Sequence, residues 1–186
     1  MSPEHPFPLE TEWVNRMVEA GLSRFHLRRT FNTADDQMRY LELFDKTVRE
    51  KIIVHQYQEH VLSHGMKQVH IKAQERNEKK LAHYWQHCST SFHKIDELNQ
   101  QGGAFNYCFI SPLFDSLSKP GYKGHTSLQS EVKDVPFPVY ALGGITIHTV
   151  TALKGGGFKG VAAIGAIWQN NPLEQYLRLK EACHGL

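Results

Sequence analysis

Two short apolar runs, each ending in glycine, lie close together in the last third of the chain. The first, Pro138 to Leu142, stops at Gly143-Gly144, and the second, Gly160 to Ile164, stops at Gly165. A stretch with helical character separates them. Continuous apolar runs of this length, separated by a helix, are typical of buried parallel strands in a strand–helix–strand unit. The chain is therefore constrained towards a parallel sheet covered by helices.

The glycines at the ends of these two runs point to a phosphate site. Their backbone N–H groups are not shielded by side chains, which suits an anion. A single glycine of this kind is explained equally well as a turn residue. Two in succession are typical of the loops that bind phosphate after the last two strands of a (β/α)8 barrel.

Further strands are expected upstream, which makes seven in total, and each is followed by a helix or a loop. Their centres are expected near residues 25, 53, 69, 90, 108, 140 and 162. Residues 34–50 and 77–86 are predicted helices. The chain opens with a predicted helix, residues 11–20, where an eight-stranded barrel begins with a strand. We therefore predict an α/β fold, a TIM (β/α)8-type barrel that lacks its first strand or has it truncated, in a single domain spanning residues 1–186.

Composition excludes several classes of function. The net charge of +2 does not indicate a nucleic-acid partner, and no apolar run approaches the ~18 residues of a membrane span. The N-terminus lacks the basic and apolar regions of a signal peptide. The three cysteines are far apart and show no CxxC spacing. These features predict a reduced, cytoplasmic protein.

Histidine recurs at the predicted strand ends, where a parallel barrel carries its chemistry: His26, His55, His70 and His93. A lone histidine there is more often a hydrogen-bonded structural residue than a catalyst. A barrel metallohydrolase would use several, commonly as an HxH pair on one strand, but no HxH occurs. That interpretation is therefore the less favoured one. The loop from Phe114 to Lys119 holds two hydroxyls and an ammonium, which can all donate hydrogen bonds to phosphate.

Five segments, in order, resemble motifs of the thiamine phosphate synthase/TenI family: FHLRR, STSFHKIDEL, SPLFDSLSK, PVYALGGI and GVAAIGAI. The resemblance implies a TIM barrel that handles a thiazole phosphate. Synthases of this family join hydroxymethylpyrimidine pyrophosphate to the thiazole phosphate with Mg²⁺. The TenI branch includes thiazole tautomerases, which move a proton to aromatise the thiazole.

The resemblance also implies roles for individual residues. Phosphate contacts are expected from Ser116, Ser118, Lys119, Gly143, Gly144, Gly165 and Ala166. The catalytic residues are expected to be His93, for proton transfer, with Arg28 and Ser91. The pyrimidine and pyrophosphate side of the pocket corresponds to His26, His55, Gln56 and His70, and Glu75 is a weak candidate metal ligand.

The departures from the family pattern lie mostly on the pyrimidine side. His26 stands where synthases have Gln, and Thr30 where they have Lys. Gln56 replaces an aspartate that binds Mg²⁺, and only Glu75 remains as a carboxylate. We therefore predict a thiamine biosynthesis or salvage protein that binds thiazole phosphate or thiamine phosphate and is TenI-like. The alternatives are a genuine synthase, which would need Mg²⁺, and a non-catalytic sensor of the phosphorylated ligand. We expect no other cofactor and no membrane partner, and the sequence leaves open whether the chain forms a homo-oligomer.

Overall fold

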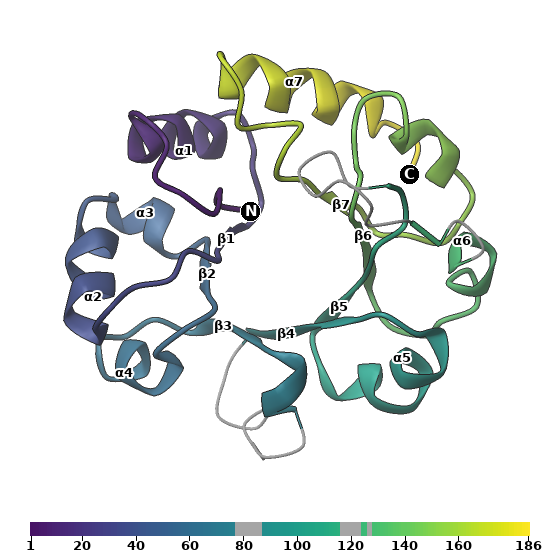
Figure 1. Cartoon of the computed structure of the whole chain (residues 1–186), viewed down its shortest axis with the longest axis horizontal. Helices are drawn as coiled ribbons and strands as arrows, with labels where there is room; N and C mark the ends of the chain where they lie inside the picture. The colour runs from purple at the N-terminus through teal and green to yellow at the C-terminus, as the bar shows by residue number, and fades with distance from the viewer. Residues whose placement is uncertain (77–86, 116–123, 126–127) are drawn as a thin grey trace.

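The computed structural model describes residues 1–76, 87–115, 124–125 and 128–186, and in them seven parallel strands form one curled sheet. The strands pair in sequence order around a common axis, with helices on the outside (Figure 1). They are β1 (Phe25–Leu27), β2 (Ile52–Val54), β3 (Gln68–Ile71), β4 (His87–Phe92), β5 (Tyr107–Ile110), β6 (Val139–Leu142) and β7 (Val161–Ala162). The predicted seven-stranded, truncated barrel is confirmed.

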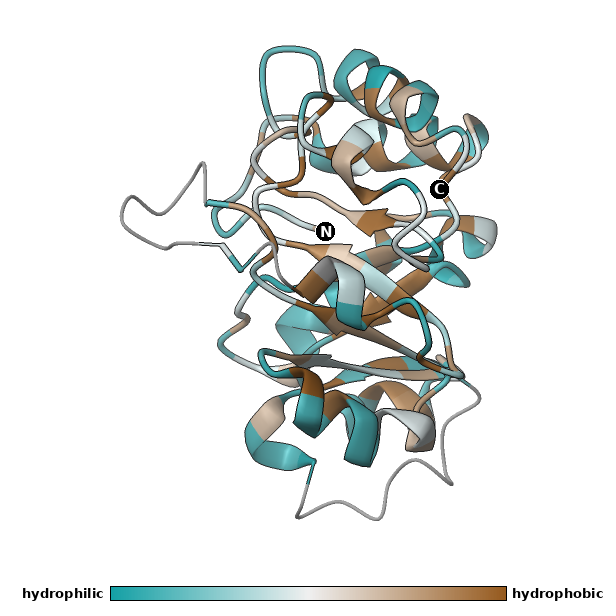
Figure 2. Ribbon diagram, turned by 90° about the vertical axis from the view of Figure 1, so that its right-hand side faces the viewer, coloured by the Kyte–Doolittle hydropathy of each residue, from teal (hydrophilic) through white to brown (hydrophobic). Residues whose placement is uncertain are grey.

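The helices cover the outer face of this sheet, with their hydrophilic sides turned to solvent (Figure 2). They are α1 (Glu10–Glu19), α2 (Ala34–Glu42), α3 (Lys46–Arg49), α4 (Gln58–Ser63), α5 (Ile95–Gln101), α6 (Leu128–Glu131) and α7 (Pro172–Ala182). Short 3₁₀ turns lie at η1 (Ala73–Glu75), η3 (Gly102–Ala104) and η4 (Val150–Leu153). None of the helices in the described ranges is long and apolar enough to cross a membrane.

The prediction of one continuous helix over residues 34–50 is wrong. The chain leaves the helix between α2 and α3, where Asp45 has an extended backbone and its carbonyl accepts from the N–H groups of Val48 and Arg49. Aspartate competes with the helix for backbone hydrogen bonds, which favours such a restart. Leu43, expected on the apolar face, is 63% exposed at the break. The predicted helix over residues 77–86 lies outside the described residues.

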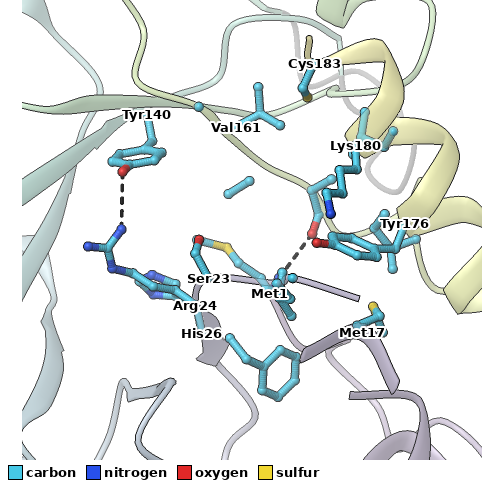
Figure 3. A pocket seen from close by; sticks show the side chains of 18 of the residues that line it. Met1, Met17, Ser23, Arg24, His26, Tyr140, Val161, Tyr176, Lys180 and Cys183 are labelled. Atoms are coloured by element: carbon cyan, nitrogen blue, oxygen red, sulfur yellow. Dashed lines mark hydrogen bonds between the residues drawn. The ribbon is translucent and has the colours of Figure 1, made fainter. Parts of the chain in front are cut away.

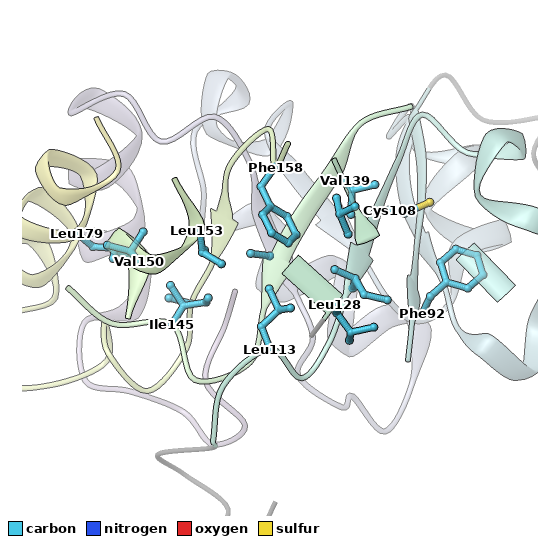
Figure 4. Close-up of a cluster of buried hydrophobic side chains, with 14 of the residues drawn as sticks. Phe92, Cys108, Leu113, Leu128, Val139, Ile145, Val150, Leu153, Phe158 and Leu179 are labelled. Carbon is cyan, nitrogen blue, oxygen red and sulfur yellow. The ribbon is translucent and has the colours of Figure 1, made fainter. Parts of the chain in front are cut away.

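The hydrophobic core lies between the outer face of the sheet and the helices. Alternate residues of a strand point to opposite faces, so Cys108 and Ile110 of β5 and Val139 and Ala141 of β6 point towards the helices. Figure 4 shows this cluster continuing to Phe92 on one side and to Leu179 of α7 on the other. The core is therefore outside the barrel, and the other alternating row of each strand faces the barrel interior.

The barrel is open between β1 and β7, which do not pair in the described structure. The first two residues of the chain lie in this gap. The Ser2 N–H donates to the His26 carbonyl of β1 at 2.8 Å, and the Met1 amino group donates to the Ala163 carbonyl beyond β7 at 3.2 Å. The indole of Trp168 donates to the Met1 carbonyl at 2.7 Å. The position of the missing strand is thus occupied in part by the N-terminus, while α1 and α7 contact each other outside it.

Candidate functional site

The strand register brings a row of polar and aromatic side chains into the barrel interior. His70 of β3 is paired with Ser89 of β4, and Ser89 with Tyr107 of β5. Tyr107 and Tyr140 of β6 lie next to each other, with ring centroids 5.3 Å apart. Barrels of this type usually fill their interior with branched aliphatic residues. A polar interior is costly unless its groups are hydrogen-bonded, so these side chains form networks.

Three histidines from neighbouring strands meet in this interior. His26 lies in β1, His55 directly follows β2, and His70 lies in β3. The Nδ1 of His26 is 2.9 Å from the Nε2 of His55, and the rings of His55 and His70 stack with centroids 4.2 Å apart. The structure therefore brings together three of the four residues predicted for the pyrimidine side.

Each of the three histidines has a lowered pKa. Burial is the main cause in all three cases, because it disfavours the charged imidazolium. Nearby positive charge adds to it, and Arg28 contributes at both His55 and His70. The pKa of His70 falls to about 3. The cluster is therefore neutral at physiological pH.

Ser91, one of the predicted catalytic residues, belongs to this cluster. Its hydroxyl lies 3.2 Å from the Nε2 of His70, whose Nδ1 lies 2.9 Å from the hydroxyl of Ser89. Arg28 is exposed at the end of β1, and its backbone N–H donates to the Ser2 hydroxyl at 2.8 Å. The two residues thus lie at different depths, Ser91 half-buried in the barrel and Arg28 at its rim.

His93 follows the last residue of β4 and is exposed at the carboxyl end of the barrel. Its Nδ1 donates to the backbone carbonyl of Ser111, which follows β5, at 2.7 Å. A carbonyl can only accept, so the neutral imidazole carries its proton on Nδ1. The Nε2 of His93 then carries the lone pair of the ring that can accept a proton.

The glycines after β6 pack against the same segment that holds His93. The Phe114 N–H donates to the Gly143 carbonyl at 3.2 Å, and Gly143 and Gly144 have positive φ angles of 94° and 63°. A Cβ on Gly143 would lie 2.7 Å from the Cα of Pro112, and one on Gly144 would lie 2.4 Å from the Asp115 carbonyl oxygen. Only glycine fits this close approach of the two loops.

The backbone groups predicted to contact phosphate are available at two loops. Within residues 1–76, 87–115, 124–125 and 128–186, no acceptor takes the N–H groups of Gly143, Gly144, Gly165 and Ala166. Gly165 and Ala166 open the turn after β7, in which the N–H groups of Ile167 and Trp168 both donate to the Ile164 carbonyl. Ser116, Ser118 and Lys119, which were predicted to complete this site, lie outside the described residues.

The side chains described at the predicted metal position offer Mg²⁺ a single carboxylate. The Gln56 Oε1 accepts from the backbone N–H of Phe31 at 3.0 Å, so this amide fastens the loop after β1. The Glu75 carboxylate accepts from the Lys72 N–H at 3.3 Å and from the Gln58 Nε2 at 3.1 Å. Mg²⁺ requires several hard oxygen ligands in near-octahedral geometry. Gln56 and Glu75 contribute one occupied amide and one hydrogen-bonded carboxylate, so most ligands of a Mg²⁺ ion here would have to come from water and substrate phosphates.

A cavity of about 320 Å³ opens beneath the N-terminus, between β1 and β7 (Figure 3). It is lined by Arg24 and His26 of the β1 segment and by Tyr107 and Tyr140. The Arg24 guanidinium donates to the Tyr140 hydroxyl at 3.2 Å and lies 4.5 Å from the centre of the Tyr107 ring. Sequence reasoning missed these three residues. The alternation of Arg24 with His26, and of Tyr107 with Phe109, is the signal that could have placed them on the inner face.

The sequence and the fold of this chain are similar to those of known proteins. The model of a family described as thiamine monophosphate synthase matches residues 5–167. A thiamine-phosphate synthase from Caldivirga maquilingensis is 36% identical over 93 residues, which are 47% of this chain and 45% of that protein. One from Salinibacter ruber is 33% identical over 98 residues, 50% of this chain and 42% of that protein. The matched part thus spans less than half the length of these relatives.

Solved structures resemble the whole chain. A thiamine phosphate pyrophosphorylase from Bacteroides thetaiotaomicron superposes with a TM-score of 0.79 at 24% identity, covering 97% of this chain and 94% of that one. One from Pyrococcus furiosus gives a TM-score of 0.77 at 17% identity, covering 98% and 92%. At these identities the likeness establishes the fold, of which the described chain has seven strands.

Proposed function

Because this chain belongs to the thiamine monophosphate synthase family, we propose that it binds a phosphorylated thiazole and moves a proton on it, as a TenI-like tautomerase. The observation that carries the proposal is the hydrogen bond from the Nδ1 of His93 to the Ser111 carbonyl. It fixes the tautomer in which the Nε2 of an exposed imidazole carries the lone pair of the ring. A general base needs such a lone pair within reach of the substrate.

The position of His93 relative to the glycine loops supports the same function. The segment Ser111–Phe114 touches His93 at one end and Gly143 at the other. A phosphate on the N–H groups of Gly143, Gly144, Gly165 and Ala166 would anchor one end of the ligand, and the thiazole ring would extend from there towards His93. Anchoring by a remote phosphate holds the reacting ring in place, which is a large part of the catalytic advantage.

The proposed reaction needs one group that both accepts and returns a proton. The Nε2 of His93 takes a proton from one position of the non-aromatic thiazole, and the ring electrons shift. The resulting imidazolium, stabilised by the Ser111 carbonyl, returns a proton at the second position. The substrate and product have the same composition, so no further reactant is consumed. The double bond has moved into the ring and the thiazole is aromatic.

A synthase reaction is the second candidate, and the descriptions of the family and of its relatives favour it. Departure of pyrophosphate builds up negative charge that Mg²⁺ and cationic side chains stabilise. The side chains of Gln56 and Glu75 provide a single carboxylate for that ion. For this reason we place the synthase second.

The test is an activity measurement with two matched variants, His93→Gln and His148→Gln. Both replace an exposed histidine by an isosteric amide, and His148 lies in the turn after β6. With EDTA present, we expect isomerisation of the thiazole phosphate, followed by NMR, to fall by at least about 100-fold in His93→Gln, since general acid–base catalysis contributes that much. His148→Gln should keep the activity of the unaltered chain.

Two results would contradict the proposal. Turnover of the pyrimidine pyrophosphate and the thiazole phosphate to thiamine phosphate, dependent on Mg²⁺ and at rates usual for enzymes, would establish the synthase. Binding of thiazole phosphate or thiamine phosphate in calorimetry, with neither reaction detectable, would establish a sensor.

A further inference from the structure

We propose that His26, His55 and His70 form a binding site for one divalent transition-metal ion of the Zn²⁺ class. The three side chains are 4–6% exposed, and one nitrogen from each lies within 4.8 Å of the others. His26 and His70 lie in β1 and β3, and His55 directly follows β2 between them, so the pairing of these strands holds the three Cα positions close together. The cluster is therefore preassembled by the sheet.

The hydrogen bonds around the cluster direct one nitrogen of the His26 ring and one of the His70 ring towards the centre. The Nε2 of His26 is 2.8 Å from the Tyr107 hydroxyl, which leaves its Nδ1 facing His55. The Nδ1 of His70 is 2.9 Å from the Ser89 hydroxyl, which leaves its Nε2 beside Ser91. Metal-binding histidines characteristically use their second nitrogen for such a contact, which fixes the tautomer and orientation of the ring.

The chemistry of the three groups selects the class of ion. All three donors are imidazole nitrogens, which suit Zn²⁺, Cu²⁺ and Ni²⁺, whereas Mg²⁺ and Ca²⁺ prefer oxygen ligands. A metal binds the neutral imidazole, and burial keeps these three rings neutral. Three histidines with an open fourth position are also the ligand set of several zinc sites that activate water.

Ion binding requires a small rearrangement. Three nitrogens bound at about 2.0–2.1 Å around a tetrahedral ion lie roughly 3.3 Å apart. The His26–His55 separation of 2.9 Å therefore lengthens and its hydrogen bond is replaced, while nitrogens that are up to 4.8 Å apart move closer together. The rings of His55 and His70 are within 17° of parallel and turn so that both lone pairs face the ion. The positive charges of Arg24 and Arg28 nearby favour hydroxide or another anion as the fourth ligand.

The ion has a route to the cluster and a consequence for the pocket. His26 and Tyr107 line the cavity beneath the N-terminus, so this cavity gives access from the amino end of the barrel. The same histidines occupy the region that family resemblance assigns to the pyrimidine. A metal ion held by these histidines would therefore occupy the side of the barrel that binds the pyrimidine in the family.

The experiment uses the full chain after removal of bound metal with a chelator. Co²⁺ is added while visible absorption is recorded, and Zn²⁺ binding is measured by calorimetry and by the change in melting temperature. We expect one ion per chain, the intense visible absorption of tetrahedral Co²⁺, and a higher melting temperature with Zn²⁺. Thiolate ligation would give a separate sulfur-to-cobalt absorption band, which should be missing.

His60 of α4 is half-buried and His64 directly after α4 is exposed; their rings lie 4.7 Å apart, so this pair could hold an ion near the surface and needs its own control. We therefore measure the double variant His60→Ala/His64→Ala, which should bind Co²⁺ as the unaltered chain does. Loss of all binding in this variant would overturn the proposal.

The deciding variants are His26→Gln and His55→Gln, with His148→Gln as the matched exposed control. Loss of a group that hydrogen-bonds a metal-binding histidine weakens metal binding about 10–100-fold, so loss of a ligand itself should weaken it by more than about 100-fold. Tyr107→Phe should weaken it about tenfold for the same reason. Circular dichroism shows whether each variant folds, and the second variant decides the test if the first does not fold. Unchanged affinity in a folded variant, or no 1:1 binding by the unaltered chain, would refute the site. Neither outcome affects the proton transfer by His93, which is assayed with EDTA.

Discussion

Acidification of the metal-free protein should destabilise it through the buried histidine cluster, and His70 allows the effect to be calculated. Its pKa is lowered from 6.5 to about 3, mainly by burial and then by Arg28, Lys72 and Arg76. Below pH 6.5 the unfolded chain therefore binds a proton that the folded chain does not. The contribution of His70 to the free energy of unfolding is fully present above pH 6.5 and is lost as the pH falls towards 3.

The size of the effect follows from the two pKa values. At pH 5 the imidazole is about 97% protonated in the unfolded chain and about 1% protonated in the folded one, which corresponds to a loss of about 2 kcal/mol between pH 7.5 and pH 5. For a domain of this size, that is a fall of about 4–8 °C in melting temperature. The pKa values of His26 and His55 are lowered too, so the whole cluster acts in the same direction.

The assay is urea unfolding at pH 7.5 and pH 5, with EDTA present, for the unaltered chain and for His70→Gln. The buried Met1 amine also has a lowered pKa, about 5, and contributes to the pH dependence, but it does so in both proteins. The loss of stability on acidification should be smaller in His70→Gln by about 2 kcal/mol. An equal loss in both proteins would show that the pKa of His70 is not lowered in the folded chain. Titration of His70 near pH 6.5 in the NMR spectrum of the folded chain would show the same, and either result would refute the reasoning.

Three further predictions concern the open seam between β1 and β7, the glycine loop after β6, and Lys119. Six to eight apolar residues placed ahead of Met1 should pair with both sheet edges and raise the melting temperature in calorimetry, whereas an equally long glycine–serine extension should not. Gly144→Ala should lower the free energy of unfolding by about 1–3 kcal/mol in urea, because the φ angle is positive and the new Cβ would meet the Asp115 carbonyl; wild-type stability would show that the loop yields freely. Lys119→Ala should weaken thiazole phosphate binding tenfold or more in calorimetry, since a charge-assisted contact is worth about 1.5–3 kcal/mol, and unchanged affinity would exclude this lysine from the site.

Several features of the site could be predicted from local sequence. The apolar runs that become β6 and β7, and the glycines that follow β6, were recognisable because a buried strand needs continuous apolar residues and a tight turn needs glycine. The sequence also predicts a strand centred near residue 90 with His93 at its end, and β4 ends at Phe92. The break between α2 and α3 was missed, since the apolar periodicity continues through it and only the backbone of Asp45 interrupts the helix.

The sequence by itself determined the number, order and parallel direction of the strands, because these depend on short-range patterns of apolar residues and glycine. The tertiary structure alone decided which side chains meet inside the barrel. His26, His55 and His70 are up to 44 residues apart in the chain, and a shift of one residue in the register of any strand would turn its histidine towards the helices. The pairing of β1, β2 and β3 fixes that register, and the seating of Met1 and Ser2 in the open seam depends on edges that exist only once the sheet has curled. Contacts between distant segments are set by the packing of the whole sheet, which no local pattern encodes.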